Sequence, residues 1–397
     1  MTAFGLIGIM ISIAGFHFAR ASESRARFIF FVLLLLLHIG AAIAGYLYSQ
    51  EFGGDAIMYY HDQLGIYGRE IGLSTIFVVN FVQFLKSYFG GTYFDYFLLF
   101  QSMGFWGILF VLRAFDEIHE ELGQPTFKNI YLLLFLPGLH YWTVGIGKDG
   151  PNFLGVAMCT WAAFRLETRW VAFGAGLAIV LLVRPHIALM ALVAFALALL
   201  VGRGTSLLMR AGLLAVVLAG IGSVAGLVEG LVYGLNFSSA DSMAQVLESR
   251  SMVSEESGAD LSITGASFPV RLLSLLFRPF FFDANGVFGY VASLENLVLL
   301  GVFIILVRRF ATGFAVARAT VFARFSFFFF VLITAMLALF NYNVGLGLRQ
   351  KMMMMPALLV FFVAMMAVRT SQKGLVYGPA GAAYARAPVA EQGYRRA

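Results

Sequence analysis

Long apolar stretches recur along this chain, and they limit its fold more than any other feature. A helix needs about 20 residues to cross the roughly 30 Å hydrocarbon core of a membrane. The chain is 60% hydrophobic and 12% charged, which is more apolar than a water-soluble domain. The stretches are 3–19, 28–48, 93–113, 129–146, 151–164, 170–184, 186–202, 211–233, 286–307, 321–341 and 352–368. We therefore expect an all-α polytopic integral membrane protein with about 11 transmembrane helices in one domain, residues 1–368.

The basic residues indicate how these predicted helices are oriented. Most of the 27 Lys and Arg residues fall in one set of loops, which the positive-inside rule assigns to the cytoplasm. The amino terminus is then outside and the carboxyl terminus inside, with outer loops at 49–92 and 236–285. Residues 73–89 are typical of an interfacial helix on the outer face. Residues 236–268 are either a lid or a solvated loop, and 369–397 is expected to be a disordered cytoplasmic tail.

The sequence gives little support to several common kinds of site. Its single cysteine, Cys159, lies within an apolar stretch, so neither a disulfide framework nor a cysteine-ligated zinc site is expected. The six histidines include no pair four residues apart on one helix, as a zinc hydrolase would need. The segment "GIGKDG" at 145–150 matches a dinucleotide fingerprint only formally, because no soluble strand precedes it. We expect no metal, no cofactor and no nucleic-acid partner.

The first outer loop carries acidic and aromatic residues in "GGDAIMYYHD". Asp55 and Tyr59 are four residues apart, so a helix that begins after the two glycines places them on one face. Asp55 is a suitable N-cap for that helix, which is its structural interpretation. Its functional interpretation is a general base at the membrane surface, where partial desolvation raises the pKa of a carboxylate. Tyr59 would then support it.

Nine of the 27 basic residues fall on the side that the positive-inside rule depletes, and five of these nine are candidate ligands. Arg184 and Arg278 each precede a proline, which lets the guanidinium project from a helix end. Lys148 lies in a short outer turn, and Arg349 and Lys351 lie in "NVGLGLRQK". Such a group suits a phosphate or diphosphate, because arginine makes paired contacts with its oxygens and lysine supplies a point charge. Snorkelling towards lipid head groups is the structural alternative.

Four more residues are placed to support these cations. They are Asp149, His186, Asp283 and Glu295. Asp149 follows Lys148 directly, and it either steadies that lysine in a binding site or forms a plain ion pair with it. Asp283 and Glu295 are close enough in sequence to orient Arg278.

The order of these motifs along the chain carries a family resemblance. The motifs are "GGDAIMYY", "GIGKDG", "VRPHI", "FRPFFFDAN" with "SLENL", and "NVGLGLRQKMMMMP". Their order resembles that of bacterial polysaccharide polymerases of the Wzy and EpsG type, which are similar to the GT-C class of lipid-dependent glycosyltransferases. The resemblance implies a GT-C-like fold and an acidic base in the first outer loop, here Asp55. It also implies outer arginines that handle a polyprenyl diphosphate, here Arg184, Arg278 and Arg349.

These features predict an enzyme of the bacterial inner (cytoplasmic) membrane. Its substrate would be a polyprenyl-linked sugar or oligosaccharide, with membrane lipid around it and polysaccharide-export or chain-length proteins as partners. The choice between a chain polymerase and a single-sugar, inverting transferase stays open. A transporter or flippase of lipid-linked glycan is the alternative, because "KDGP" and "VRPH" interrupt apolar helices as transporter sites do. A non-catalytic membrane scaffold is the third interpretation.

Overall fold

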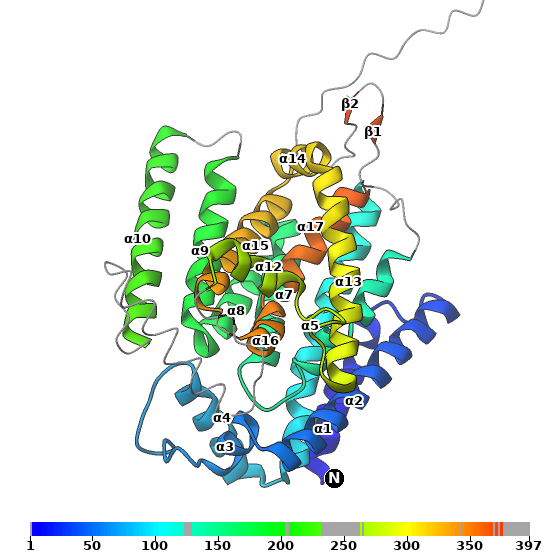
Figure 1. Ribbon diagram of the computed structural model, residues 1–397, viewed down its shortest axis with the longest axis vertical. Coiled ribbons are helices and arrows are strands. Elements are labelled where there is room, and N and C mark those ends of the chain that lie inside the picture. The colour runs from blue at the N-terminus through cyan, green and yellow to red at the C-terminus, as the bar shows by residue number, and fades with distance from the viewer. Residues whose placement is uncertain are drawn as a thin grey trace, which may run out of the picture.

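The computed structural model describes residues 2–122, 129–202, 206–231, 263, 266–341, 343–367, 370–371 and 374–375, and these are almost entirely helical (Figure 1). The longer helices are α1 (Ala3–Phe18), α2 (Arg25–Phe52), α4 (Thr75–Phe89), α5 (Tyr93–Leu122), α7 (Asp149–Ala162), α8 (Leu166–Val183), α9 (Pro185–Leu200), α10 (Leu207–Leu231), α13 (Gly286–Arg308), α15 (Val321–Phe340) and α17 (Met355–Ala367). The shorter ones are α3 (Asp55–His61), α6 (Pro137–Tyr141), α12 (Phe268–Phe277), α14 (Phe310–Ala319) and α16 (Val344–Lys351). Two short strands, β1 (Thr370–Ser371) and β2 (Gly374–Leu375), pair antiparallel. The helical fold class is thus confirmed.

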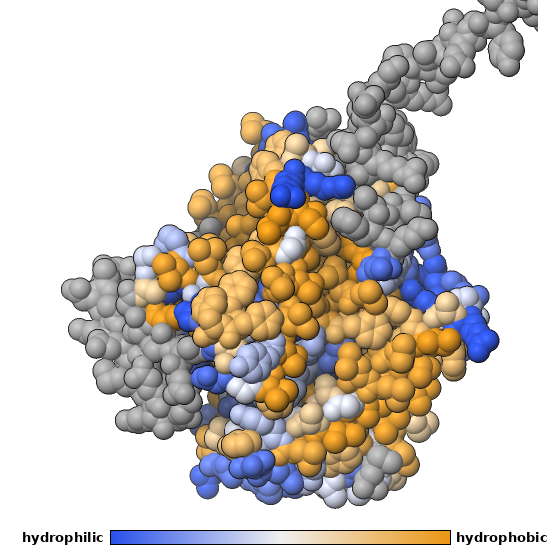
Figure 2. Space-filling model, turned by 45° about the vertical axis from the view of Figure 1, so that its right-hand side comes forward, coloured by the Kyte–Doolittle hydropathy of each residue, from blue (hydrophilic) through white to orange (hydrophobic). Residues whose placement is uncertain are grey.

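Several helices have the length and composition of membrane spans. Within the described residues, five helical segments qualify, or six if α16 and α17, which meet at a 60° bend, count as one broken span. Figure 2 shows apolar side chains across the middle of the visible face and hydrophilic residues gathered at its lower end. The protein is therefore compatible with a membrane-embedded position, and the count of 11 spans stays a prediction.

The apolar stretch 129–146 does not form the single helix that a simple crossing requires. It contains a 3-10 helix, η1 (Ile130–Phe135), then α6 and a series of turns. Pro137 explains the break, because the residue before a proline is disfavoured in helical geometry and Leu136 has a ψ of 124°. The backbone N–H of Gly138 donates instead to Oε2 of Glu295 on α13, at 2.6 Å.

The segment Asp149–Val183 folds back on itself as a hairpin of α7 and α8. Gly155 and Gly176 allow the two backbones to touch, since a Cβ atom on Gly155 would lie 2.6 Å from the carbonyl oxygen of Gly176. Asp149 begins the first arm and Arg184 directly follows the second. The hairpin therefore brings these two charged residues to the same end of the molecule.

The predicted outer elements gather at one end of the molecule. In Figure 1 the amino terminus, α3 and α4 lie at the lower end, whereas α14 lies at the upper end. The helix expected at 73–89 is present as α4. Of the predicted lid 236–268, only residues 263 and 266–268 are described, and of the predicted tail 369–397 only β1 and β2 are. The lid and disorder predictions therefore fall largely outside the described residues.

Candidate functional site

Charged side chains from distant segments meet at the end of the molecule that carries α3. We call Asp55, Lys148, Asp149, Arg184 and Arg349 the outer cluster. Arg349 donates through Nε to Oδ2 of Asp149 at 2.5 Å and through Nη2 to Oδ2 of Asp55 at 2.9 Å. Arg184 donates through Nη2 to Oδ1 of Asp149 at 2.5 Å. One carboxylate thus orients two arginines, and one of these arginines also holds Asp55.

Asp55 reaches the cluster from the first turn of α3. The preceding Gly53 and Gly54 have φ values of 75° and 118°, which residues other than glycine rarely adopt. Gly54 is the N-cap and Asp55 is the first helical residue, so the N-cap interpretation of Asp55 is wrong. Its carboxylate is therefore available to bind Arg349 rather than the helix backbone.

The two carboxylates of the cluster differ in their access to solvent. The side chain of Asp149 is 12% exposed and contacts two arginines, whereas that of Asp55 is 38% exposed and contacts one. Arg184 lies between α8 and α9, with extended φ and ψ of −148° and 78°, and Pro185 starts the next helix where its missing N–H matters least. Asp149 is thus the buried centre of the cluster and Asp55 its accessible edge.

Lys148 occupies the cluster without pairing with its chain neighbour. Its Nζ donates to Oγ1 of Thr75 at 3.0 Å, while the ion pairs of Asp149 go to the two arginines. The plain Lys148–Asp149 ion pair, one of the two interpretations of Asp149, is therefore wrong. Burial and the charge of Arg184 lower the pKa of Lys148 to about 8. Thr75 was not identified from the sequence, and its side chain also hydrogen-bonds the phenol of Tyr59. Burial and the negative charge of Asp55 raise the pKa of this phenol.

Some polar atoms around the cluster have no hydrogen-bond partner among the described residues. Nε of Arg184 and Nδ1 of His186 are buried and make no hydrogen bond to any described residue. Buried polar groups are normally hydrogen-bonded, so such atoms need an explanation. The cluster also holds three cations, Lys148, Arg184 and Arg349, against two carboxylates. Excess positive charge and unpaired polar groups are what an anion-binding site requires.

Arg278 lies in a separate ion pair between α12 and α13. It donates to Asp283 through Nε at 2.7 Å and through Nη2 at 3.0 Å, a bidentate arrangement. This hydrogen bonding lowers the pKa of Asp283. The expected contact between Asp283 and Arg278 is confirmed. The corresponding expectation for Glu295 is wrong, because that carboxylate binds the N–H of Gly138.

Lys351 is buried, although the sequence suggests a phosphate ligand. Its side chain is 1% exposed and donates to Oδ1 of Asn296 on α13. Lys351 ends α16 only two residues after Arg349, so the two side chains leave this short helix in different directions. A phosphate in solvent could reach Arg349 but not Lys351.

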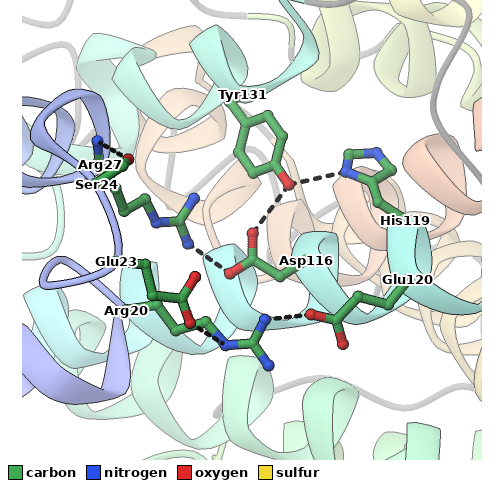
Figure 3. Close-up of a pocket in the computed structure, with 8 residues that line it drawn as sticks. All are labelled: Arg20, Glu23, Ser24, Arg27, Asp116, His119, Glu120 and Tyr131. Atoms are coloured by element: carbon green, nitrogen blue, oxygen red, sulfur yellow. Dashed lines mark hydrogen bonds and ion pairs between the residues drawn. The ribbon is translucent and has the colours of Figure 1, made fainter.

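A second charged region lies at the carboxyl-terminal end of α5. We call it the inner network, and its ion pairs join Arg20, Arg27, Arg113, Arg165 and Arg169 to Glu23, Asp116, Glu117, Glu120 and Glu121. Part of it borders a cavity of about 260 Å³ (Figure 3). There Asp116 lies between Arg27 and the hydroxyl of Tyr131, which donates to it at 2.9 Å. All five arginines belong to the set that the sequence assigns to the cytoplasm.

Comparison with known proteins identifies no relative. No protein-family model, curated protein or solved structure matches the chain. Within the described residues, no group of three or more His, Cys, Asp or Glu side chains is arranged to hold a metal ion. The chemistry of the outer cluster therefore carries the functional inference.

Proposed function

We propose that this protein is an inner-membrane glycosyltransferase or polysaccharide polymerase. It would act on polyprenyl (di)phosphate-linked glycans at the outer face of the bacterial cytoplasmic membrane, with a GT-C-like arrangement of about 11 spans. The observation that carries the proposal is the outer cluster. Cations from separate parts of the chain converge beside an accessible carboxylate, at one end of a bundle of apolar helices.

The outer cluster can exchange one of its carboxylates for a phosphate. Arg349 contacts Asp55 at the exposed edge and Asp149 in the interior. An incoming phosphate would replace Asp55 on Nη2 of Arg349, while Asp149 keeps the guanidinium oriented through Nε. Release of Asp55 leaves three cations, Lys148, Arg184 and Arg349, and one inner carboxylate around the phosphate.

The same exchange frees a base for the reaction. The hydroxyl oxygen of the acceptor sugar would attack the anomeric carbon of the donor, and the bond between that carbon and the phosphate oxygen would break. The phosphate leaves with the electron pair and is stabilised by the cations, while the hydroxyl proton passes to Asp55. A single displacement of this kind inverts the anomeric centre and needs no covalent enzyme intermediate.

Deletion of the gene in its host tests the proposal. Mass spectrometry of lipid-linked and surface glycans should show a single undecaprenyl-linked repeat unit accumulating if the protein is a polymerase, or a repeat unit one sugar short if it is a transferase. Wild type and Glu51→Gln should restore the profile, whereas Asp55→Asn should not. Glu51 is a suitable control because it is an exposed carboxylate four residues from Asp55. A glycan profile that is unchanged by deletion would contradict the proposal.

Transport of a lipid-linked glycan is the second candidate function. The 60° bend between α16 and α17 and the breaks at Lys148 and Arg184 favour it, because transporters bind substrates at interrupted helices. Alternating access requires these positions to be reached from both sides of the membrane. Cysteines at positions 149 and 184 that react from the cytoplasm would favour transport, and reaction from the outside alone would favour the enzyme.

A further inference from the structure

A buried polar bridge joins the Arg278 segment to the helix that carries Arg349. Its centre is Asn296 on α13, whose side chain is fully buried. Nδ2 of Asn296 donates to the carbonyl oxygen of Pro279 at 2.8 Å, and Oδ1 accepts from Nζ of Lys351. Both ends of one amide are therefore used to connect two segments that lie far apart in the sequence.

The bridge requires an amide at its centre. A lysine ammonium group only donates and a proline carbonyl only accepts, so the residue between them must accept on one side and donate on the other. An aspartate would keep the contact to Lys351 and lose the donor to Pro279. A leucine would lose both contacts and leave a buried lysine without its hydrogen bond, which is unfavourable in an apolar core.

Each end of the bridge lies next to a candidate phosphate ligand. Pro279 directly follows Arg278, whose guanidinium is fixed by Asp283, and Lys351 follows Arg349 by two residues. Packing of α12 against α16 brings the same two segments together. Asn296 therefore connects the segment that follows Arg278 to the helix that carries Arg349.

We propose that Asn296 is a positioning residue for Arg278, holding it in register with the outer cluster so that both act on one lipid-linked phosphorylated donor. This inference rests on the proposed function. It assigns Lys351 to the bridge rather than to phosphate binding, in agreement with its burial. The neighbouring Glu295 anchors α6 through Gly138, so two consecutive residues of α13 tie it to three parts of the bundle: α6, the segment at Pro279, and α16.

A distance measurement tests the geometry without any substrate. Spin labels on cysteines introduced at Tyr88 and Phe282, which are 72% and 84% exposed, would report the position of the Arg278 segment relative to α4. The single native cysteine, Cys159, is 1% exposed and should stay unlabelled. Pulsed electron paramagnetic resonance should show a broader or shifted distance distribution in Asn296→Leu and in Asn296→Asp. Distributions identical to that of the unmutated labelled protein would overturn the inference.

Binding of inorganic pyrophosphate tests whether Asn296 acts through Arg278. In the full-length protein in lipid nanodiscs, Asn296→Leu should weaken binding about tenfold, and in an Arg278→Ala background the same change should weaken it less than about twofold. Asn296→Gln, which keeps both donor and acceptor, should restore part of the affinity. Ser293→Ala is the matched control, because Ser293 is also buried on α13 but bonds only the carbonyl of Gly289 in its own helix.

The outcomes separate this inference from the proposed function. An equal loss of affinity in both backgrounds would show a general structural role for Asn296 and would overturn the inference. Wild-type protein that binds no pyrophosphate would contradict the proposed anion site, and the spin-label distances would then decide the role of Asn296 alone. If Asn296→Leu does not fold, Asn296→Asp provides the same two comparisons.

Discussion

The outer cluster and the inner network both consist of basic and acidic side chains, but in different proportions. The ion pairs of the inner network join five arginines to five carboxylates, whereas the outer cluster has three cations and two carboxylates. Glu117 of the inner network accepts from Arg113, Arg169 and the indole of Trp161. Buried polar atoms without a partner among the described residues occur in both regions: Nε of Arg184 and Nδ1 of His186 at the outer cluster, and Nε2 of His119 beside the inner network. The balance of charge is therefore what distinguishes the two regions.

This difference separates a region that holds helices together from one that is prepared for a ligand. The inner network is balanced in charge and links α2, α5 and the α7–α8 hairpin. The outer cluster has positive charge in excess and one carboxylate at a solvent-exposed edge. Substitutions in the inner network should therefore act mainly on stability, and substitutions in the outer cluster mainly on binding and reaction.

Removal of Arg349 should have the largest effect on function. Arg349→Ala is expected to lower product formation about 10²–10³-fold, because it removes the group that links the phosphate site to Asp55. Arg349→Lys should recover only part of this loss, since a lysine cannot contact two partners in one plane. Product can be measured by mass spectrometry of lipid-linked glycans in a deletion strain. Arg69→Ala is the control and should leave product unchanged, because Arg69 is an exposed cation of the first predicted outer loop, 49–92.

Neutralising Glu117 should lower the stability of the protein and leave its affinity for pyrophosphate unchanged. Its side chain is 2% exposed and pairs with two arginines, so Glu117→Gln should lower the free energy of unfolding by about 3–5 kcal/mol. Denaturant unfolding of the protein in detergent would measure this change. Pyrophosphate affinity of the folded fraction should equal that of wild type. A large loss of affinity would remove the proposed distinction between the two regions.

Affinity for pyrophosphate should depend on pH through Lys148. Its pKa is about 8, so the ammonium form predominates below that pH and the neutral amine above it. Since an anion binds the charged form more tightly, affinity should fall by several-fold, up to about tenfold, as the pH rises from 7 to 9. Titration calorimetry at a series of pH values would measure this. Lys148→Arg should abolish the fall, and its persistence in that variant would assign it to another group.

The smallest effect is expected at the rim of the inner network. Arg20 pairs with Glu120, and both side chains are more than a third exposed, at 35% and 44%. Exposed pairs contribute little, so Glu120→Gln should change the free energy of unfolding by less than about 1 kcal/mol. Comparison with Glu117→Gln in the same denaturant experiment would show how strongly the effect depends on burial.

The long apolar stretches of the sequence predicted most helices but not the break at Pro137. Hydropathy alone made 129–146 resemble a span, because its residues are as apolar as those of true helices. Pro137 indicated a boundary, yet the contact that stabilises the broken form comes from Glu295, far along the chain. Such a tertiary contact cannot be inferred from local sequence.

The sequence nominated most of the outer cluster without showing how its members pair. Local chemistry identified Asp55, Arg184 and Arg349, and the structure brings them together through Asp149. The neighbours Lys148 and Asp149 suggested an ion pair, but successive residues at a helix start point in different directions. Asn296 and Thr75 were missed because nothing in the local sequence marks the distant residue that a polar side chain on an apolar helix will bind.

The α7–α8 hairpin has a consequence for membrane insertion. Its two arms contact each other along glycines, and Asp149 and Arg184 pair where the arms end. In the proposed topology this end of the hairpin lies outside. A pair that forms before the hairpin leaves the insertion machinery would then let the two charges cross the bilayer as a neutral unit instead of as separate ions, which lowers the cost of translocation. The contact that shapes the outer cluster in the mature protein would then also assist its biogenesis.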